Sequence, residues 1–388
     1  MFFSHSSKNL RLIFDIGSGS IGGAAVLEEG ARAPTLLATA RLPISLEPTI
    51  AKSELKRLLC SSLEIILKDL AAPFRAAGQP MRVKQVDCVF AAPWYSAKTR
   101  EISVSKNESF VVSPELVNEL LKKEEQIFEG EAVRSAFESL IHDDLHMIER
   151  QPMQIFVNGY HVGSLYGKRG RELRMSVYMS IVPHSIVEIV EDIIHKTLHT
   201  SHLSFHSFPL LLFGAVRILY PGEEHYLLVD IAGEATDVVC VVGGSLAGVA
   251  TMPLGAAALR KTLARKLSVS QELAGSRLSL FAEGNLEAEM ARTLREQTGE
   301  ALRDWLAAFE KASKQCQGGL LSRIFLTVDA YARPLYEETL KESKIFGSAP
   351  QLFFLDETMT SRAISRAPSV QADPFLSLET CALSKRSP

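Results

Sequence analysis

Two stretches of this sequence share one pattern, LIFDIGSGSIGGAAVL from Leu12 to Leu27 and LLVDIAGEATDVVCVV from Leu227 to Val242. Each contains an apolar run, an Asp-Ile pair, a turn of small residues and a second apolar run. Short apolar runs on either side of a turn of small residues are typical of paired β-strands. The sequence therefore predicts two similar halves, each built around one β-hairpin.

The turns inside these two hairpins are suited to phosphate. Small residues let backbone N–H groups approach an anion closely, because no large side chain stands in the way. The aspartate at the end of the preceding strand is a ligand for hydrated Mg²⁺. Two facing turns would clamp a polyphosphate from both sides; the alternative is a pair of plain turns whose aspartates cap neighbouring amides.

Length and composition indicate a folded protein of two lobes. The chain has 388 residues, with 46% apolar and 22% charged residues, which suits two domains or two lobes with an insertion. A net charge of -3 gives no electrostatic reason to expect nucleic acid as a partner. The five cysteines are scattered and never in C-x-x-C spacing, so we expect neither a disulfide framework nor a zinc knuckle, and a reducing cytoplasm is the expected compartment.

One uncharged segment, Val238 to Leu259, is long enough to be tested as a membrane span. Its glycines and Pro253 divide it into two short β-like runs joined at Gly243-Gly244-Ser245. This pattern predicts a hairpin inside a sheet rather than a membrane helix.

The remaining periodicity predicts a mixed α/β protein. In the first half, strands are expected at 12–16, 24–27, 35–40 and 86–92 and a helix at 53–70. A helix starting at Ser113-Pro114 and strands at 154–157 and 173–181 indicate a small α/β module inserted into the first lobe. Further helices at 185–198 and 286–316, a strand at 324–327 and an exposed loop at 358–373 complete the prediction.

With these motifs in place, the sequence resembles the actin-like superfamily, within which it is most similar to the cell-division protein FtsA and the type IV pilus assembly protein PilM. LIFDIGSGSIGGAAV and LLVDIAGEATDVVCV look like the two phosphate motifs, and VNGYHVGSLYGKRGREL (157–173) looks like the subdomain that these two families carry. MPLGAAALRKTLARKLSVS, after the second hairpin, looks like their glycine turn and helix. The resemblance implies two RNase H-like mixed sheets flanked by helices, with ATP in the cleft between the lobes.

The resemblance also implies boundaries along the chain. The first lobe is expected at 8–84 and, after an inserted subdomain at 85–183, again at 184–226. The second lobe is expected at 227–375 with a helical subdomain at about 265–320, and a C-terminal core helix at 376–388.

Carried over residue by residue, the resemblance implies a nucleotide site. The expected cofactor-binding residues are Asp15, Gly17, Ser18, Gly19, Ser20, Asp230, Gly233, Glu234, Thr236 and Gly255. Asp15 and Asp230 would hold Mg²⁺ through water when nucleotide binds. No catalytic residue is assigned.

Three departures from the family pattern weaken the expected ATP site. Ala232 and Glu234 stand where the division proteins usually have glycines, and a carboxylate beside a phosphate costs Coulomb energy. QELAGSRL (271–278) lacks the acidic-then-lysine signature that the family has near the adenosine. FLTVDAYARP (325–334) places Val328, Asp329 and Ala330 where the adenosine motif has glycines, so side chains would crowd the nucleotide. We expect weak ATP and Mg²⁺ binding or none, and little or no ATPase activity.

Histidines offer a second candidate chemistry. His195, His199, His202 and His206 form a dense cluster, and its first two members have the i, i+4 spacing of a helical zinc site. His142 and His146 have the same spacing, although solvated imidazoles give this pattern as well. No P-loop, Rossmann or nucleophile-elbow motif is present in the sequence.

The expected function is that of an actin-like scaffold of the pilus type with a degenerate ATP cleft. It would be cytoplasmic and peripheral to the inner membrane, recruited by the short cytoplasmic tail of a membrane protein, with possible self-association into dimers or filaments. The alternatives are a division scaffold of the FtsA type that polymerises, and an active ATP-dependent kinase or ATPase of the same superfamily.

Overall fold

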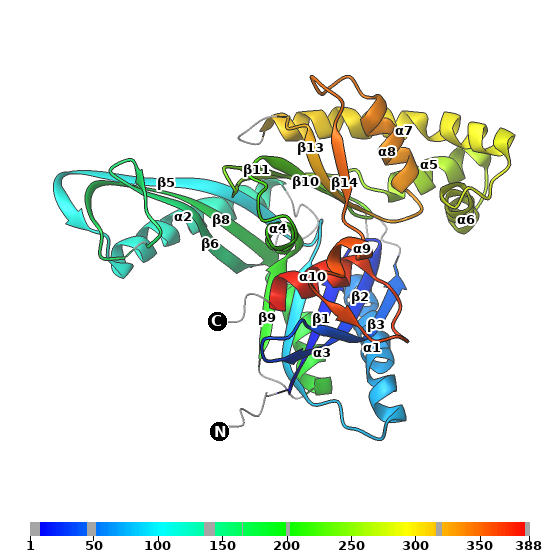
Figure 1. Ribbon diagram of the computed structural model, residues 1–388, viewed down its shortest axis with the longest axis horizontal. Helices are drawn as coiled ribbons and strands as arrows, with labels where there is room; N and C mark the ends of the chain where they lie inside the picture. Colours follow the sequence, from blue (N-terminus) through cyan, green and yellow to red (C-terminus); the bar gives the residue numbers. More distant parts are fainter. Residues whose placement is uncertain are drawn as a thin grey trace.

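The computed structural model describes residues 8–44, 52–135, 144–164, 166–198, 202–315 and 320–384. It contains three sheets (Figure 1), of which the first has the strand order β15-β3-β2-β1-β4-β9. The strands of this sheet are β1 (Lys8–Ile16), β2 (Ser20–Glu29), β3 (Thr35–Pro43), β4 (Val83–Phe90), β9 (Leu203–Ser207) and β15 (Ser365–Arg366).

The second sheet repeats the arrangement of the first. Its order is β12-β11-β10-β13-β14, so each half has an antiparallel three-stranded meander followed by two parallel strands. The strands are β10 (Tyr226–Ile231), β11 (Thr236–Val242), β12 (Ser245–Met252), β13 (Arg323–Val328) and β14 (Gln351–Phe354). The prediction of two similar mixed sheets is confirmed.

Helices cover both faces of the two sheets. In the first lobe α1 (Lys52–Ala76) and α3 (His184–Leu198) pack on one face, against Leu12 and Phe14 of β1. Ile13 points to the other face, where α4 (Phe208–Leu219) and α10 (Pro374–Ser384) lie between the two sheets. Successive residues of a strand point to opposite faces, so an apolar run such as LIF is required here.

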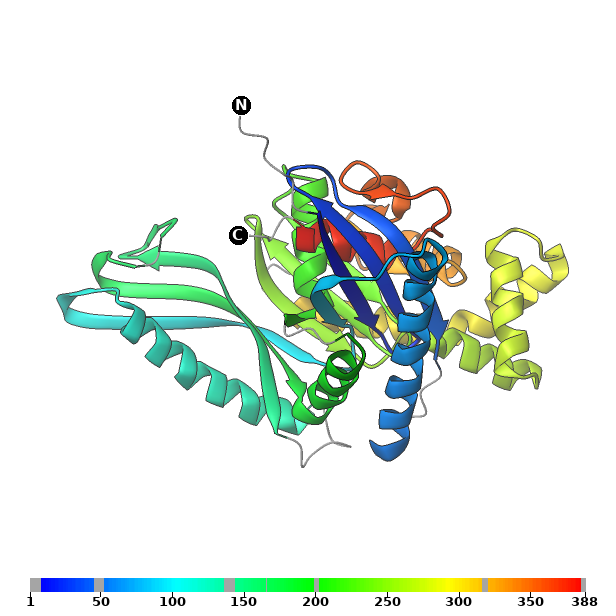
Figure 2. The ribbon, with the colours of Figure 1, turned by 90° about the horizontal axis from the view of Figure 1, so that it is seen from below.

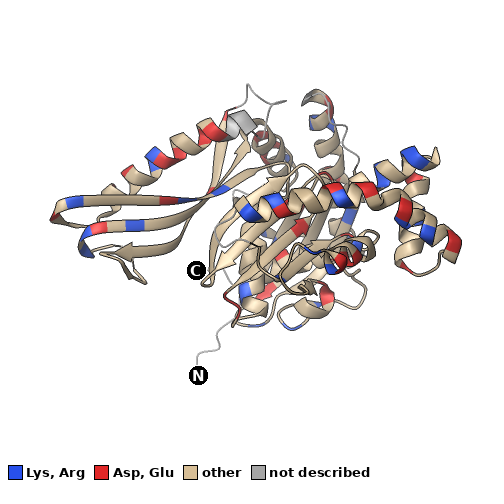
Figure 3. Cartoon of the chain, turned by 90° about the horizontal axis from the view of Figure 1, so that it is seen from above, with Lys and Arg blue, Asp and Glu red and all other residues tan. Residues whose placement is uncertain are grey.

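The outer face of the second sheet carries the helical part of the second lobe. Its helices are α5 (Ala257–Leu267), α6 (Gln271–Ala282), α7 (Ala288–Gln315) and α8 (Arg333–Glu342). Trp305 and Phe309 of α7 stack in this core, and Leu227 and Val229 of β10 face it. Figure 3 shows Lys and Arg interspersed with Asp and Glu along α7, so this helix does not present a face of one charge.

The third sheet belongs to the insertion, which projects from one side of the molecule (Figures 1 and 2). Its strand order is β5-β8-β6-β7. The elements are β5 (Ser96–Val111), α2 (Pro114–Ser135), β6 (Leu145–Val157), β7 (Tyr160–His161) and β8 (Arg169–Pro183). Apolar residues of α2, among them Val117 and Leu121, pack on this sheet around Met175 and Val177.

Some segments differ from the sequence-based expectation. β4 pairs with β1, so the expected boundary at 85 falls inside a first-lobe strand, and the sheet of the insertion begins only at Ser96. The segment 358–373 is mostly irregular and exposed, as expected, but it also contains the end of α9 (Glu357–Thr360) and β15, which pairs with β3, and Thr360 is buried. The expected C-terminal helix is α10, and residues 385–388 lie outside the described part of the chain.

The uncharged segment Val238–Leu259 forms a hairpin, as predicted, and the start of α5. β11 and β12 pair across Gly243 and Gly244, which have φ values of 58° and 68°. Glycine occupies such left-handed conformations without steric cost. Within the described ranges, no helix combines the length and apolarity that a membrane span requires.

Candidate functional site

The two predicted phosphate turns meet in the centre of the molecule. We call Gly17–Ser20 the first elbow and Ala232–Ala235 the second elbow. A Cβ atom placed on Gly233 would lie 2.6 Å from the backbone N of Gly19, so the two main chains are in contact. The backbone N–H of Glu234 also donates a hydrogen bond of 3.0 Å to Ser18 Oγ. The main chain of each elbow therefore fills the space in which a phosphate bound to the other elbow would lie.

Asp15 and Asp230 line one small cavity, together with both elbows. Its volume is about 30 Å³, and Phe208 and Phe375 form part of its wall. That volume suits a few water molecules at most, whereas pockets for ligands of nucleotide size measure hundreds of Å³. The sequence correctly placed the two aspartates on opposite sides of a shared cleft.

Arg41 of β3 lies beside Asp15 and holds the position that a cation would take. Its guanidinium is 2.7 Å from Asp15 Oδ2 and 2.6 Å from Asp373 Oδ2, and it donates to Ser20 Oγ at 2.8 Å. The register of β2 and β3 sets Arg41 opposite Gly22, where a Cβ would lie 2.7 Å from the guanidinium. A glycine at position 22 therefore makes room for the arginine over the first elbow.

Buried carboxyl groups surround this arginine. Burial raises the pKa of Asp15, and the positive charge of Arg41 offsets only part of that effect. Burial, followed by the charge of Asp237, holds the pKa of Asp230 well above its usual range, and burial also raises the pKa of Asp329. Glu379 of α10 is fully buried, and burial together with the charge of Asp15 holds its pKa well above the ordinary value.

Asp237 stands opposite Asp230 on the neighbouring strand of the second hairpin. It accepts hydrogen bonds from Thr251 Oγ1 and from the hydroxyl of Tyr95, a residue that follows β4 in the first lobe. Burial raises the pKa of Asp237 to about 6, although both hydrogen bonds act to lower it. This aspartate connects the two lobes directly.

Three expected site residues, Thr236, Glu234 and Gly255, are held by contacts within the second lobe. Thr236 is buried; its hydroxyl donates to the carbonyl of Leu254 at 2.6 Å and accepts from Trp305 Nε1 at 3.0 Å. The carboxylate of Glu234 is paired with Lys261, with oxygens 2.7 and 2.9 Å from Nζ. Gly255 packs so closely on the second elbow that a Cβ would lie 2.4 Å from the carbonyl oxygens of Ala232 and Gly233.

The turn expected to hold adenosine begins α8. The carbonyl of Asp329 accepts hydrogen bonds from the N–H groups of Ala332, at 3.0 Å, and Arg333, at 3.2 Å. The Asp329 side chain faces the central cavity, and the turn continues into Tyr331, which is partly buried. The side chains of this turn thus occupy the approach to the cleft.

Three features of the cleft determine whether it has room and ligands for Mg-ATP. The elbows are in backbone contact, the cavity holds only water-sized volume, and Arg41 neutralises the aspartate expected to hold Mg²⁺. The central cleft of this structure does not fit the nucleotide.

Sequence reasoning missed three residues of the cleft: Arg41, Asp373 and Asp237. Asp237 could have been found from the sequence, because it is the only charged residue in the apolar strand TDVVCVV (236–242). Arg41 and Asp373 lie 332 residues apart and carry no local signal of their meeting. The histidine pairs remain predictions, because His142 and His199 lie outside the described residues; within the described ranges no metal-binding group of His, Cys, Asp and Glu is found.

A second and larger concavity lies where the insertion joins the first lobe. A groove of about 460 Å³ runs between residues 146–151 of β6 and residues 203–206 of β9. A neighbouring depression of about 440 Å³ continues it along β6 to α4 and to Gly244 and Ser245 of the second lobe, and both are lined by Gln151 and Leu210. We call the two together the insertion groove.

Both strands that border the insertion groove are sheet edges. β9 ends the first sheet, and among the described strands it pairs only with β4. β6 pairs with β8 along one side, and in the described chain its other side is covered by β7 only at Phe156 and Val157. The main chain of an edge strand has N–H and C=O groups available for another strand, so the groove is a candidate site for an extended peptide.

Comparison with known proteins identifies the architecture. No protein family model and no curated protein matches the sequence. Among solved structures, a chain of the PilM-PilN type IV pilus biogenesis complex is similar over 97% of this chain and 99% of its own length, with a TM-score of 0.66 and 14% identity.

Two weaker similarities accompany that match. The ethanolamine utilization protein EutJ from Carboxydothermus hydrogenoformans has a TM-score of 0.46 at 13% identity over 89% of this chain and 85% of its own. A protein with an actin-like ATPase fold from Bacteroides thetaiotaomicron has a TM-score of 0.44 at 10% identity over the full length of both chains. Together with the repeated sheets and facing elbows, the match to the pilus complex confirms the predicted architecture: this chain has the two-lobed actin-like fold of the PilM type.

Proposed function

We propose that this chain is a cytoplasmic scaffold that binds the short cytoplasmic tail of an inner-membrane protein in the insertion groove. The observation that carries the proposal is the pair of open strand edges, β6 and β9, on the two sides of a groove of about 460 Å³. A tail in extended conformation would add a strand to one edge through main-chain hydrogen bonds, and its side chains would enter the groove. Apolar residues such as Met147, Phe205 and Leu210 are available to them.

The similarity to the PilM-PilN complex supports a role in type IV pilus assembly. In that solved structure a PilM protein is found together with PilN. By extension, the partner of this chain would be a PilN-type membrane protein, and the scaffold would be held at the inner membrane by that partner. At 14% identity the similarity shows the fold, and the choice of partner is our inference.

Nucleotide has no necessary part in this proposal. Arg41 and the touching elbows stabilise the cleft without a ligand. The insertion groove reaches the β11–β12 hairpin at Gly244 and Ser245, so a bound tail would contact all three parts of the molecule. We propose that tail binding, rather than ATP, fixes the relative position of the lobes.

The test is a pull-down, followed by calorimetry, with synthetic cytoplasmic tails of inner-membrane proteins encoded beside the pilus genes. We expect a PilN-type tail to bind the wild-type chain and the S105R variant, since Ser105 is an exposed residue of β5. The S204R variant should lose binding, because Ser204 lines the groove and an arginine there would fill it. Equal binding by S204R and S105R would contradict the proposed site.

The same experiment separates the alternatives. Capture of a tail from the division filament, in place of the pilus tail, would favour the FtsA-type scaffold, and concentration-dependent filaments in light scattering would support its polymerisation. Binding of Mg-ATP with a micromolar dissociation constant would support the kinase or ATPase alternative.

A further inference from the structure

The insertion has an inner end, which joins the first lobe, and an outer end, which projects away from the rest of the molecule (Figures 1 and 2). β5 pairs with β8 from Ser96 and Ile181 at the inner end to Val111 and Arg169 at the outer end. The ladder of β6 with β8 ends there as well, and the hairpin of β6 and β7 follows it. We call residues 105–111, 157–164 and 166–174 the outer end.

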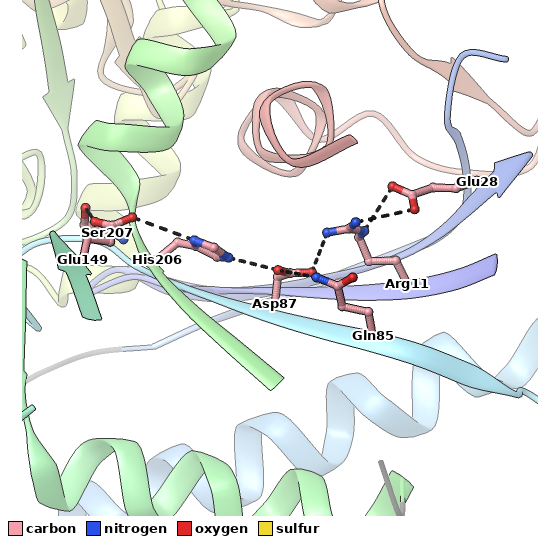
Figure 4. Close-up of polar contacts among 7 residues, drawn as sticks. All are labelled: Arg11, Glu28, Gln85, Asp87, Glu149, His206 and Ser207. Carbon is pink, nitrogen blue, oxygen red and sulfur yellow. Dashed lines mark hydrogen bonds and ion pairs between the residues drawn. The ribbon is translucent and has the colours of Figure 1, made fainter. Parts of the chain in front are cut away.

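At the inner end, basic side chains have partners within the chain. Arg11 and His206 of the first lobe lie on two sides of Asp87, at 2.8 and 2.9 Å, and His206 also lies beside Glu149 of β6 (Figure 4). Within the insertion, the bases that are paired with glutamates of α2 are Lys98, Arg100 and Arg150. These cations are engaged in contacts inside the molecule.

The outer end carries basic side chains without such partners. It contains five Lys and Arg and two Glu, a formal charge of +3 on a chain whose total is -3, and counting Glu115 at the start of α2 leaves +2. All five bases are exposed, and none of them forms an ion pair within the described residues. The five are Lys106, Lys168, Arg169, Arg171 and Arg174.

Aromatic side chains accompany these bases. Tyr160 is 78% exposed and Tyr166 is 54% exposed. Arg174 lies over the ring of Phe156, 5.2 Å from its centroid, a contact that holds the base in place and leaves its positive charge open to an anion. A tyrosine combines an apolar ring with a polar tip, which suits the boundary between lipid and water.

We propose that the outer end binds the anionic phospholipid headgroups of a membrane surface. Its bases would lie at the headgroup phosphates, and Tyr160 and Tyr166 would enter the boundary region. Each Lys or Arg near such a surface strengthens binding by roughly fivefold. A free phosphate ion would need the bases alone, so the two exposed tyrosines favour lipid.

The shape of the insertion also favours a flat surface. β8 has 15 residues and spans roughly 45 Å along its length, so the outer end is far from the lobes. Because the screening length at physiological salt is about 8 Å, the negative charge of the lobes does not oppose a contact made at this end. A membrane touches a projecting end without approaching the rest of the chain.

This contact is additional to the proposed tail in the insertion groove and does not require it. Stable attachment to a membrane generally takes two signals, since one basic patch binds weakly. The inner end of the same insertion forms a wall of the groove through β6, so the insertion would connect the two contacts.

The test is co-sedimentation of the full chain with vesicles, without any peptide. We expect binding to vesicles of phosphatidylcholine mixed with phosphatidylglycerol, none to phosphatidylcholine alone, and weaker binding as salt rises. The K168Q/R169Q variant should bind roughly thirtyfold more weakly. The matched control is K56Q/K68Q, which removes two exposed charges from α1 and should bind as wild type does.

A second variant, Y160S, separates lipid from a free anion. It should bind the anionic vesicles more weakly at every salt concentration, because the contribution of the ring is not electrostatic. Wild-type binding by Y160S, together with displacement of the chain from vesicles by inorganic phosphate at constant ionic strength, would assign the bases to a free anion instead.

Other outcomes would overturn the proposal as well. Equal binding of wild type and K168Q/R169Q, or equal binding to the two kinds of vesicle, would show that the outer end does not recognise anionic lipid. Tighter binding to single-stranded RNA than to anionic vesicles would make it a nucleic-acid surface. None of these results bears on the groove, because no tail is present in the experiment.

Discussion

The central cleft and the insertion groove differ in how their buried charges are paired and in how much volume they leave open. In the cleft, Arg41 bridges Asp15 and Asp373, the elbows touch, and a cavity of about 30 Å³ remains. In the groove, about 460 Å³ stays open, and a buried carboxylate keeps one oxygen without a hydrogen-bond partner in the described chain. The cleft is enclosed by its own side chains, and the groove keeps open volume between two strand edges.

The difference shows that a sequence motif and the geometry that it adopts need not agree. The two turns were predicted to hold a phosphate and a metal ion, yet here Arg41 supplies a cation at that place. Buried polar groups cost free energy unless they are paired, and the carboxylates of the cleft are paired within the chain. Open volume between two strand edges is therefore a better guide to a ligand than the sequence motif. The variants below test whether the cleft is a structural element and the groove a binding element.

The largest loss of stability is expected for R41A, which removes the arginine that pairs with Asp15 and Asp373. Leaving Asp15 and Asp373 without their partner should lower the free energy of unfolding by about 4 kcal/mol. The control is R32A, at a side chain that is 83% exposed and paired with Glu29, where the loss should stay within about 1 kcal/mol. Urea unfolding measures both; equal losses would mean that the cleft does not depend on Arg41.

The second largest effect is a pH dependence of the free energy of unfolding that originates in the cleft. The pKa of Asp237 is raised from 3.8 to about 6 in the folded state, so the folded chain holds this proton more firmly than the unfolded chain. Its contribution, roughly 3 kcal/mol, is complete below pH 3.8 and is lost as the pH rises through about 6. The raised pKa values of Asp15, Asp230 and Glu379 act in the same direction.

Unfolding of wild type and D237N in urea between pH 4.5 and 7 checks this prediction. The fall in stability with rising pH should be shallower in D237N than in wild type. D192N, at an aspartate whose side chain is 61% exposed, should retain the wild-type slope. A D237N profile parallel to that of wild type would show that Asp237 does not take up a proton in this range.

A smaller effect tests the contact between the elbows. G233A would place a Cβ 2.6 Å from the backbone N of Gly19, so one elbow must move, at a cost of about 2 kcal/mol. G222A is the matched control, since a Cβ at Gly222 meets nothing within 4 Å, and its effect should stay within about 0.5 kcal/mol. If G233A is as stable as G222A, the elbows do not touch in solution.

Much of the fold was predictable from local patterns. The repeated Asp-Ile hairpins, the hairpin at Gly243 and Gly244 and the helix of Ser185–Leu198 follow from periodicity and turn chemistry, and they are present at nearly the expected residues. Asp15 and Asp230 were placed in one cleft because each ends an apolar strand before a turn of small residues.

The chemistry of the cleft was less predictable because it depends on pairing between distant strands. Arg41 reaches Asp15 only because the β2–β3 register, which shifts between Ala25 and Val26, sets it opposite Gly22. Asp373 arrives from a segment that looked like an exposed loop in the sequence. A groove for a partner's tail was expected, but its residues were not foreseen, since its walls, β6 and β9, belong to different sheets.

Hydrogen–deuterium exchange with two additives, Mg-ATP and a PilN-type cytoplasmic tail, tests the central claim most directly. We predict that the tail slows exchange in β6 and β9, while millimolar Mg-ATP leaves exchange at the two elbows unchanged. Slower exchange at Gly17–Ser20 and Ala232–Ala235 with Mg-ATP, and no change in β6 and β9 with the tail, would contradict the account.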